Sequence, residues 1–466
     1  MTQWDPKTGS LALPVVRAFY QSGGTPQAVF NAVFDRIDAR GLDPAWIALR
    51  SRQEVLDQAD ALDRADIPRK PLWGVPFGVK DNLDLAGMST TNGCRAHSRR
   101  AVATTPIVQC LINAGAIPVG KNNMDQFGVG INGTRTDFGV PRCAFNDAYI
   151  SGGSTSGGGV VVAAGLVSFA IGGDAAGSGR VPAALNNIVG LKPTPGLVPN
   201  TGVPTVAGLF GTNSLLTLTV DDAVTATQVI VAYDPKDPFS KPEAEKFSLS
   251  APDTPSAFRF AVPDGASRYF ADDTEAERLF DAAVARLEDL GGTAVPTDIT
   301  PFLEQASALY EGPFIAQRTA NLEAFLEKHE EDVFPATREI LGWGHGFTAK
   351  DLFRAEYKLR EVKQFAHRLF KNVALLATPT TPTTVTVAQM LADNIGQNAM
   401  LGTYTNFVNL VDLPAISVPA GFREDGIPLG LMLIGARLDD ARLAAFASAY
   451  QKLSGFPLGA TGRVYP

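Results

Sequence analysis

Two serines in glycine-rich sequence, Ser154 and Ser178, have the surroundings that best support chemistry. They lie in SGGSTSGGG and GGDAAGSGR, on either side of a stretch of small apolar residues. Glycine lets backbone N–H groups turn toward a ligand. A serine in such a loop can present its hydroxyl to a carbonyl carbon while neighbouring amides bind the oxyanion. The segment 151–180 therefore predicts an acyl-transfer enzyme.

A serine nucleophile needs a base, and the histidines provide no recognisable one. The GxSxG turn of a Ser-His-Asp hydrolase is absent, and His367 lies in a charged run typical of a solvated helix. A lysine can serve as base when burial favours its neutral form. Lys80 follows the apolar run PLWGVPFGV and is the candidate. The alternative for Lys80 is a solvated lysine beside Asp81.

Other familiar motifs are incomplete. The segment 115–121 (GAIPVGK) matches a phosphate-binding loop up to its lysine, but Asn122 replaces the hydroxyl that holds magnesium. GVGING, at 128–133, has dinucleotide-loop spacing without a clear preceding strand. The four histidines are scattered and have no cysteine partners at ligand spacing. We expect neither a cofactor nor a metal.

Composition narrows the class of protein. The chain has 466 residues, 45% hydrophobic content, a net charge of −8 and no basic tract, which disfavours a nucleic-acid surface. The start lacks a secretion signal, and the longest apolar stretch, 160–173, is too short to span a membrane. Cys94, Cys110 and Cys143 form no CxxC motif and suggest a reducing compartment. We expect a cytoplasmic protein that binds neither membrane nor nucleic acid.

Helical and strand patterns alternate along the chain, which predicts an α/β fold with helices covering a largely buried sheet. We expect strands over 71–79, 116–119 and 167–171, and helices over 107–114 and 160–166. Strand-like LLATPTTP and ISVPAG indicate a late return to the sheet. The one stretch that resembles an internal boundary is 232–255, which is rich in proline, lysine and aspartate and fits either a linker or an excursion from the fold.

Three segments in order, GVPFGVKDN, SGGSTSG and GGDAAGSGR, resemble the amidase signature family. The resemblance extends over nearly the whole chain and includes TNGC, GAIPVGKNNMDQFG, GLKPTPG and DLPAISVPAGF. It implies a large mixed β-sheet with helices on both faces in a single domain, 1–466. The parts would be an N-terminal helical segment (1–65), a signature core (66–232), a helix-rich substrate-side insert (256–370) and a return to the sheet (371–466).

The resemblance also implies roles for individual residues. In this family the nucleophile follows the bridging serine by 24 positions, which is the separation of Ser154 and Ser178. Ser178 would be the nucleophile, Ser154 the proton relay with a cis peptide, and Lys80 the base. The amides of Ala175, Ala176, Gly177 and Ser178 would form the oxyanion hole. From the residues alone, Thr155 or Ser156 could be the important hydroxyl, or these hydroxyls could cap a helix.

Longer matches resemble the allophanate hydrolases within this family, among them NGTRTDFGVPRCAFNDAYISGGS and YTNFVNLVDLPAISVPAGF. In LYEGPFIAQR, Tyr310 and Arg318 around Gly312 resemble the clamp that binds a small carboxylate-bearing substrate. A guanidinium offers a carboxylate two parallel donors, which lysine does not. By itself, this spacing equally fits an amphipathic helix with Arg318 in solvent.

Two features depart from that subfamily. The run 206–220, VAGLFGTNSLLTLTV, lacks the arginine and aspartate of the corresponding segment, and Thr155 and Gly158 stand where serines are common. The C-terminal domain of full-length allophanate hydrolases is expected to be absent.

The resemblance implies hydrolysis of allophanate or a close analogue with release of ammonia, in urea breakdown and as a homodimer. Alternatives are a carboxybiuret or malonamate hydrolase, an amidotransferase A subunit, or a non-catalytic binding module on the same fold.

Overall fold

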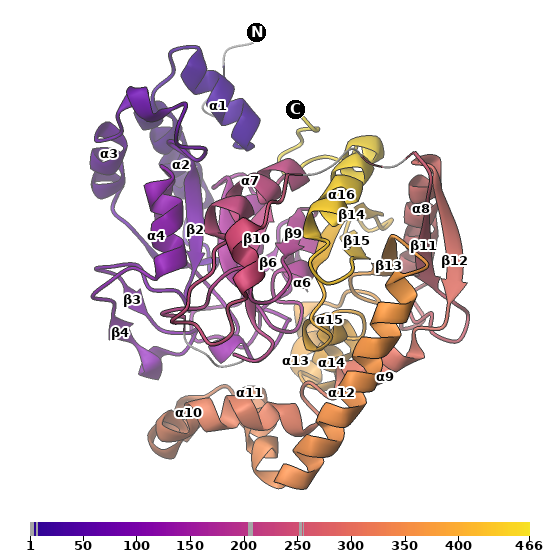
Figure 1. The fold of residues 1–466 in the computed structure, drawn as a ribbon. Helices are drawn as coiled ribbons and strands as arrows, with labels where there is room; N and C mark the ends of the chain where they lie inside the picture. The colour runs from indigo at the N-terminus through magenta and orange to yellow at the C-terminus, as the bar shows by residue number, and fades with distance from the viewer. Residues whose placement is uncertain (1–3, 6–7, 204–207, 251–253, 255) are drawn as a thin grey trace.

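A mixed sheet of eleven strands forms the centre of the computed structural model, which describes residues 1–466 except 1–3, 6–7, 204–207, 251–253 and 255 (Figure 1). In spatial order the strands are β1 (Trp46–Leu49), β5 (Ile117–Asn122), β2 (Pro76–Lys80), β8 (Phe169–Asp174), β10 (Thr212–Thr217), β9 (Val189–Lys192), β14 (Ala415–Phe422), β15 (Pro428–Ile434), β13 (Leu375–Pro379), β11 (Phe258–Pro263) and β12 (Gly292–Thr297).

Strand pairing changes across the sheet. At one edge β1 is antiparallel to β5, and β5, β2 and β8 then run parallel. The pairs from β8 through β10, β9, β14 and β15 to β13 are antiparallel, and β13, β11 and β12 are again parallel. Central strands such as β8 and β15 are buried along almost their whole length, which explains their continuous apolar sequences. The α/β fold with a large mixed sheet is confirmed.

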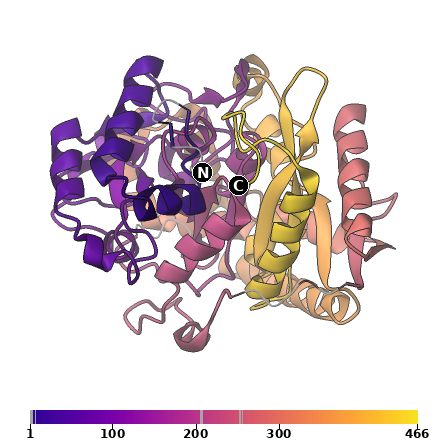
Figure 2. The same ribbon diagram turned by 90° about the horizontal axis from the view of Figure 1, so that it is seen from above.

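Helices pack on both faces of this sheet and at one end of it. They are α1 (Leu13–Gln21), α2 (Pro26–Arg40), α3 (Arg52–Asp60), α4 (Pro106–Asn113), α5 (Ser156–Ala163), α6 (Arg180–Ala184), α7 (Val220–Ile230), α8 (Thr274–Asp289), α9 (Thr300–Ser307), α10 (Ala316–His329), α11 (Pro335–Trp343), α12 (Ala349–Phe370), α13 (Val387–Ala392), α14 (Gly396–Leu401), α15 (Asn406–Leu410) and α16 (Asp440–Ser454). Figure 2 shows α16 lying over the C-terminal strands, while Figure 1 shows α10, α11 and α12 beyond one end of the sheet.

Helix ends follow local sequence signals. Ser51 caps α3 and Thr348 caps α12 through reciprocal bonds with an acidic residue three positions later. Proline stands in the first turn of α2, α4 and α11, where its missing N–H costs nothing. Within the described ranges, no helix has the length and apolar character needed to cross a membrane.

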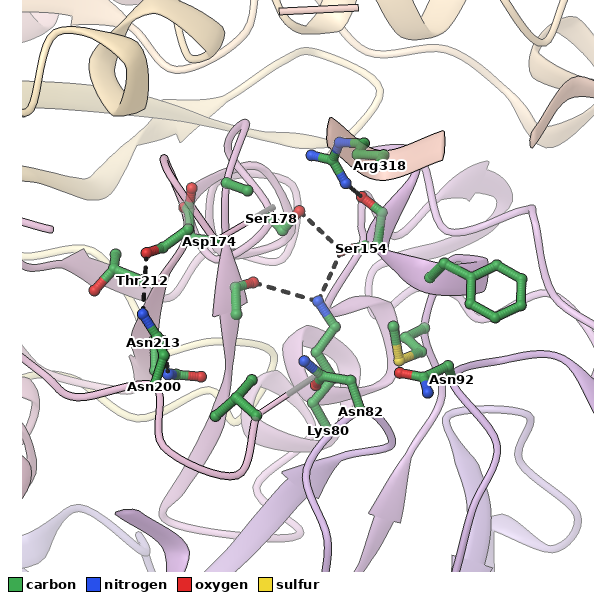
Figure 3. Close-up of a pocket in the computed structure, with 18 residues that line it drawn as sticks. Lys80, Asn82, Asn92, Ser154, Asp174, Ser178, Asn200, Thr212, Asn213 and Arg318 are labelled. Atoms are coloured by element: carbon green, nitrogen blue, oxygen red, sulfur yellow. Dashed lines mark hydrogen bonds between the residues drawn. The ribbon is translucent and has the colours of Figure 1, made fainter. Parts of the chain in front are cut away.

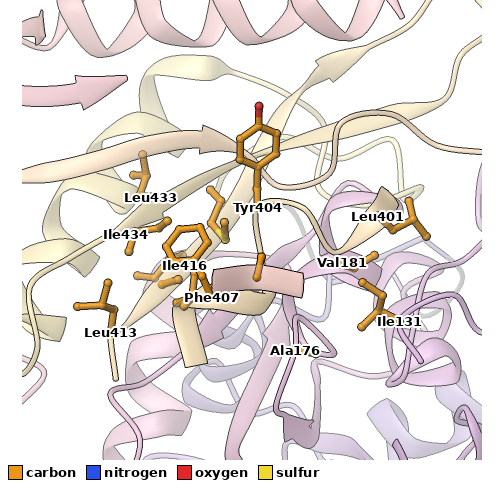
Figure 4. Close-up of a cluster of buried hydrophobic side chains, with 14 of the residues drawn as sticks. Ile131, Ala176, Val181, Leu401, Tyr404, Phe407, Leu413, Ile416, Leu433 and Ile434 are labelled. Carbon is orange, nitrogen blue, oxygen red and sulfur yellow. The ribbon is translucent and has the colours of Figure 1, made fainter. Parts of the chain in front are cut away.

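The largest hydrophobic cluster anchors the segment that carries Ser178. Ala176 and Val181, which flank that serine, pack in one cluster with Phe407 of α15, Ile416 of β14 and Leu433 of β15 (Figure 4). All five are at most 2% exposed. Because close-packed side chains resist displacement, the serine lies on a rigid support.

Most expected elements are present with shifted boundaries. β2 begins at Pro76, not at residue 71, and includes Lys80 itself. The helix expected at 160–166 is α5, Ser156–Ala163, so the glycines after Ser156 are helical. The segment 256–370 is not purely helical, because it contributes β11 and β12 at the edge of the sheet, and the segment 1–65 contributes β1.

Candidate active site

Lys80 ends β2, between the parallel neighbours β5 and β8, and its side chain is buried. Gly172 of β8 makes room for it, since a Cβ at that position would lie 2.8 Å from Cδ of Lys80. The lysine side chain therefore passes β8 without meeting a side chain at position 172, and its Nζ donates to the carbonyl oxygen of Gly173 at 3.3 Å. The hypothesis of a solvated Lys80 is wrong.

The three residues singled out from the sequence form a continuous chain of hydrogen bonds (Figure 3). Nζ of Lys80 lies 2.7 Å from Oγ of Ser154, and Oγ of Ser154 donates to Oγ of Ser178 at 2.8 Å. The peptide bond between Gly153 and Ser154 is cis. Because serine hydroxyls rotate, both can turn to donate toward a neutral Lys80, and a proton can then pass from Ser178 to Lys80 through Ser154.

The neighbouring hydroxyls do not take part in this chain. Ser156 donates to the carbonyl oxygen of Asn123, and Oγ1 of Thr155 has no hydrogen-bond partner among the described residues. The backbone N–H of Thr155 donates to the carbonyl of Ser178 at 3.2 Å, which joins the two serine loops. Of the hydroxyls considered from the sequence, Ser154 is the one that contacts Ser178.

A buried ion pair holds the loop of Ser178. Asp174 and Arg180 are both fully buried and lie 2.9 Å apart. Burial alone would raise the pKa of Asp174, but the Arg180 guanidinium and the backbone amide of Gly179 lower that pKa to about 2. Arg180 also donates to Oδ1 of Asn409 at 2.8 Å. These two residues brace the loop.

The predicted oxyanion hole needs one correction. The N–H of Gly177 donates to Oδ1 of Asp174 at 2.9 Å and is therefore not available to an oxyanion. Ala175 and Ser178 line the cavity, while the side chain of Ala176 packs in the hydrophobic cluster. No protein acceptor among the described residues takes the N–H groups of Ala175, Ala176 and Ser178. These three amides remain as candidate donors.

The surroundings of Lys80 suit a base. Burial lowers the pKa of Lys80 to about 7, and the Arg318 guanidinium lowers it as well, while the carboxylates of Asp125 and Asp174 act in the opposite direction. An amine with this pKa is neutral in a large fraction of molecules at neutral pH. It can therefore accept a proton from the serine relay.

Lys80, Ser154 and Ser178, called the triad from here on, line a cavity. It has about 580 Å³ of empty space, including its solvent-exposed mouth. Polar side chains that the sequence analysis did not single out also line this cavity: Asn82, Asn92, Asn200, Thr212 and Asn213. Asn213 donates to Asn200 at 2.9 Å across the wall. Residues 208 and 211–213 of the lining belong to the run 206–220. The departure of this run from the family pattern is the sequence signal that could have pointed to these lining residues.

Arg318 reaches the same cavity from α10. Its side chain is 2% exposed, and Nη1 donates to the carbonyl oxygen of Gly128 at 3.2 Å. Tyr310 contacts Arg318 through its ring, 5.3 Å from the guanidinium carbon, yet lines a neighbouring cavity with Trp343 and Asn406. Gly312 lines neither cavity and packs closely against the carbonyl of Ala308. Of the predicted clamp, Arg318 alone lines the triad's cavity.

The sequence profile of the family described as Amidase matches residues 28–444. The chain belongs to the amidase family. Together with the relatives that follow, this match makes it a hydrolase that acts on C–N amide bonds. The expected amidase signature resemblance is confirmed.

Two groups of amidase relatives are similar to this chain over most of its length. It is 38% identical over 442 residues to the urea amidolyase of Saccharomyces cerevisiae, covering 93% of this chain and 24% of that protein. It is 31% identical to the A subunit of the glutamyl-tRNA(Gln) amidotransferase from Pseudothermotoga lettingae, covering 90% and 92%. The chain thus spans about a quarter of the length of the curated urea amidolyases it matches.

Solved structures of proteins related to both groups superpose on this chain. The allophanate hydrolase of Kluyveromyces lactis superposes with a TM-score of 0.90 at 33% identity, covering 98% of this chain and 75% of that one. The A subunit of the Thermotoga maritima glutamyl-tRNA(Gln) amidotransferase gives a TM-score of 0.82 at 25% identity, with 100% of each chain covered. The fold is that of the amidase family throughout.

The incomplete motifs have structural roles in this amidase. Lys121, from the segment that resembles a phosphate loop, is buried on β5 and pairs with Asp81 at 3.0 Å. The GVGING segment provides Gly128, whose carbonyl accepts from Arg318. His367 is exposed on α12. In the described part of the chain, no cluster of histidine, cysteine and acidic residues is placed to hold a metal.

Proposed function

We propose that this amidase hydrolyses the terminal amide of allophanate through an acyl intermediate on Ser178. The observation that carries the proposal is the presence of two features in one cavity. The hydrogen-bonded Lys80, Ser154 and Ser178 supply the chemistry, and the buried guanidinium of Arg318 supplies a cation for a substrate carboxylate. The similarity to urea amidolyases and to an allophanate hydrolase structure supports this choice of substrate.

In the first half of the reaction, Oγ of Ser178 attacks the terminal amide carbon. Its proton moves to Ser154 while the proton of Ser154 moves to neutral Lys80. The oxyanion accepts hydrogen bonds from free amides of the loop 175–178. When the intermediate collapses, the C–N bond breaks, and the proton returns through Ser154 to the leaving nitrogen, which departs as ammonia.

In the second half, water attacks the acyl-Ser178 ester and loses its proton along the same relay. Ser178 leaves as the alcohol, and the product is N-carboxycarbamate. No decarboxylation step is assigned to this chain.

Substrate selection rests on Arg318. Its Nη2 is buried and has no hydrogen-bond partner in the described part of the protein, while Nη1 is held by Gly128. A carboxylate at Nη2 would satisfy this donor by a charge-assisted hydrogen bond. Tyr310, packed on the guanidinium, would then orient Arg318 from behind.

Ammonia release from a panel of amides tests the proposal. We expect the highest kcat/KM with allophanate, a lower value with malonamate, and values at least about tenfold lower with biuret, which lacks the carboxylate. Ser178→Ala should abolish release from every substrate. Retention of full activity by Ser178→Ala contradicts the mechanism.

An amidotransferase A subunit is the alternative, because the chain resembles such proteins over about nine tenths of their length. That function predicts glutamine as the preferred amide. A kcat/KM for glutamine above that for allophanate would favour it, and inactivity of the purified chain toward the whole panel would indicate a required partner protein.

A further inference from the structure

Asp125 is a fully buried carboxylate in the loop that follows β5. Oδ2 accepts hydrogen bonds from the N–H groups of Gly133 and Asn132 at 3.0 and 3.2 Å, and Oδ1 accepts from the N–H of Arg135 at 3.0 Å. The carboxylate acts as acceptor in all three bonds. Burial raises the pKa of Asp125, whereas the nearby Arg135 guanidinium and the backbone N–H groups of Gly133 and Arg135 favour its ionised form.

Two contacts connect Asp125 to the backbone around Ser154. Its own N–H donates to the carbonyl oxygen of Ser154 at 3.3 Å. On the other side of that serine, Gly153 packs directly on the carboxylate, since a Cβ there would lie 2.2 Å from Oδ2. Asp125 therefore touches the backbone on both sides of the residue that joins Lys80 to Ser178.

The same loop reaches the substrate side of the cavity. The N–H of Gly128 donates to the carbonyl of Asp125 at 3.0 Å, and the carbonyl of Gly128 accepts from Arg318 at 3.2 Å. One short segment thus contacts both the serine relay and the guanidinium. A displacement of Asp125 would move both.

Asp125 also acts on Lys80 through its charge. Burial is the main cause that lowers the pKa of Lys80, and three charged groups modify it: Asp125 and Asp174 raise it, and Arg318 lowers it. Asp125 has the larger effect of the two carboxylates. Each of these carboxylates also faces an arginine, because Asp174 pairs with Arg180 and the Arg135 guanidinium lowers the pKa of Asp125.

We propose that Asp125 is a positioning residue for the serine relay, which holds Ser154 between Lys80 and Ser178 through its contacts with the backbone on both sides of Ser154. This inference rests on the proposed function insofar as Lys80 is the base. It does not depend on which amide is the substrate.

The test compares Asp125→Asn with Asp125→Glu by two measurements. The first is the pH profile of kcat/KM for allophanate. The second is the pH profile of covalent labelling of Ser178 by a fluorophosphonate, which requires the nucleophile and its base but no recognition of an amide. Removing the charge lowers the pKa of Lys80, so Asp125→Asn should shift the acid limb of both profiles to lower pH by about one unit. At the pH optimum, the labelling of Ser178 in Asp125→Asn should also be at least about tenfold slower than in the wild type.

Asp125→Glu keeps the charge but displaces it by one methylene. We expect slower labelling with the acid limb near its wild-type position. Asp222→Asn is the matched control, because Asp222 is also a buried carboxylate that accepts a backbone N–H, from Leu13 at 3.2 Å, but it does not act on Lys80. Its acid limb should coincide with that of the wild type.

A wild-type labelling rate in folded Asp125→Asn overturns the inference. If Asp125→Asn does not fold, a wild-type labelling rate in Asp125→Glu overturns it instead. These outcomes leave the proposed function intact. By contrast, wild-type protein labelled at a residue other than Ser178 would overturn the relay itself, and normal labelling without allophanate hydrolysis would reject only the substrate.

Discussion

Arg318 donates from Nη1 to the carbonyl oxygen of Gly128, and this bond fixes its guanidinium at the cavity of the two serines. Burying a donor without a partner costs about 1–3 kcal/mol, and Nη2 of Arg318 is such a donor among the described residues. A ligand that supplies an anionic acceptor removes this cost. On the proposed function, we therefore expect substrates with a carboxylate to be favoured over neutral amides of the same size.

Replacement of Arg318 should remove this preference selectively. For Arg318→Gln we expect kcat/KM to fall about 10- to 100-fold with malonamate, the equivalent of one charge-assisted hydrogen bond, and little change with malonamide. The two substrates differ in the group that meets the guanidinium. Steady-state ammonia release measures both.

Lys328 provides a control for a change of cationic charge on α10, because it lies in the last turn of that helix and does not line the cavity. Lys328→Gln should keep the wild-type ratio of the two substrates. An unchanged ratio in Arg318→Gln would show that another group recognises the carboxylate.

Ser154 should matter as a proton relay and not as a nucleophile. Ser154→Ala breaks the chain between Lys80 and Ser178, whose links are 2.7 and 2.8 Å long, but leaves the Ser178 hydroxyl in place. Losing general base catalysis lowers kcat by about 10²- to 10⁴-fold. Slow labelling of Ser178 by a fluorophosphonate should persist.

The matched change is Ser156→Ala, which removes a nearby hydroxyl that bonds to Asn123 and not to the triad. We expect kcat within about threefold of wild type, since this bond is structural and worth about 1 kcal/mol. Equal losses of kcat in the two variants would argue against a relay through Ser154.

Breaking the ion pair beneath the loop should destabilise the whole protein. Arg180→Met leaves the fully buried Asp174 without its cation and removes the donors to Thr405 and Asn409. An uncompensated buried charge costs about 3–5 kcal/mol. Arg360→Met removes an exposed pair with Glu356 and should cost under about 1 kcal/mol. Urea denaturation followed by circular dichroism measures both.

Individual helices and strands could be predicted from the sequence where local patterns are strong. The chain from Ile107 to Asn113 is helical, β8 and β14 lie where apolar runs predict strands, and Lys80 stands at a strand end. The glycine-flanked serines were visible because glycine at such density has few purely structural explanations. Spacing then distinguished Ser154 from its neighbours.

What the sequence could not provide depends on contacts between distant segments. Asp125 carries no local signal, because its role comes from three amides of a later loop and from Gly153. The resemblance implies one clamp of Tyr310 and Arg318, but the two residues line different cavities. Likewise, nothing in the sequence assigns the amide of Gly177 to Asp174.

The pH dependence of catalysis should follow the protonation of Lys80, the proposed base. Lys80 must be neutral to accept a proton, and its pKa is lowered to about 7. Activity should therefore fall about tenfold per pH unit as pH decreases below about 7 and level off above it. Lys80→Met should lose this acid limb together with almost all activity.

Arg318 is one of the causes that lower the pKa of Lys80, so a carboxylate bound to Arg318 should weaken that effect and raise the pKa. The acid limb of the kcat/KM profile reports the pKa of Lys80 in the free enzyme. The acid limb of the kcat profile reports the pKa of Lys80 in the enzyme–substrate complex. With malonamate, whose carboxylate stays ionised, the limb of kcat should lie at higher pH than the limb of kcat/KM. With malonamide, or in Arg318→Gln, the two limbs should coincide. The same separation with both substrates would mean that Arg318 does not transmit substrate charge to Lys80.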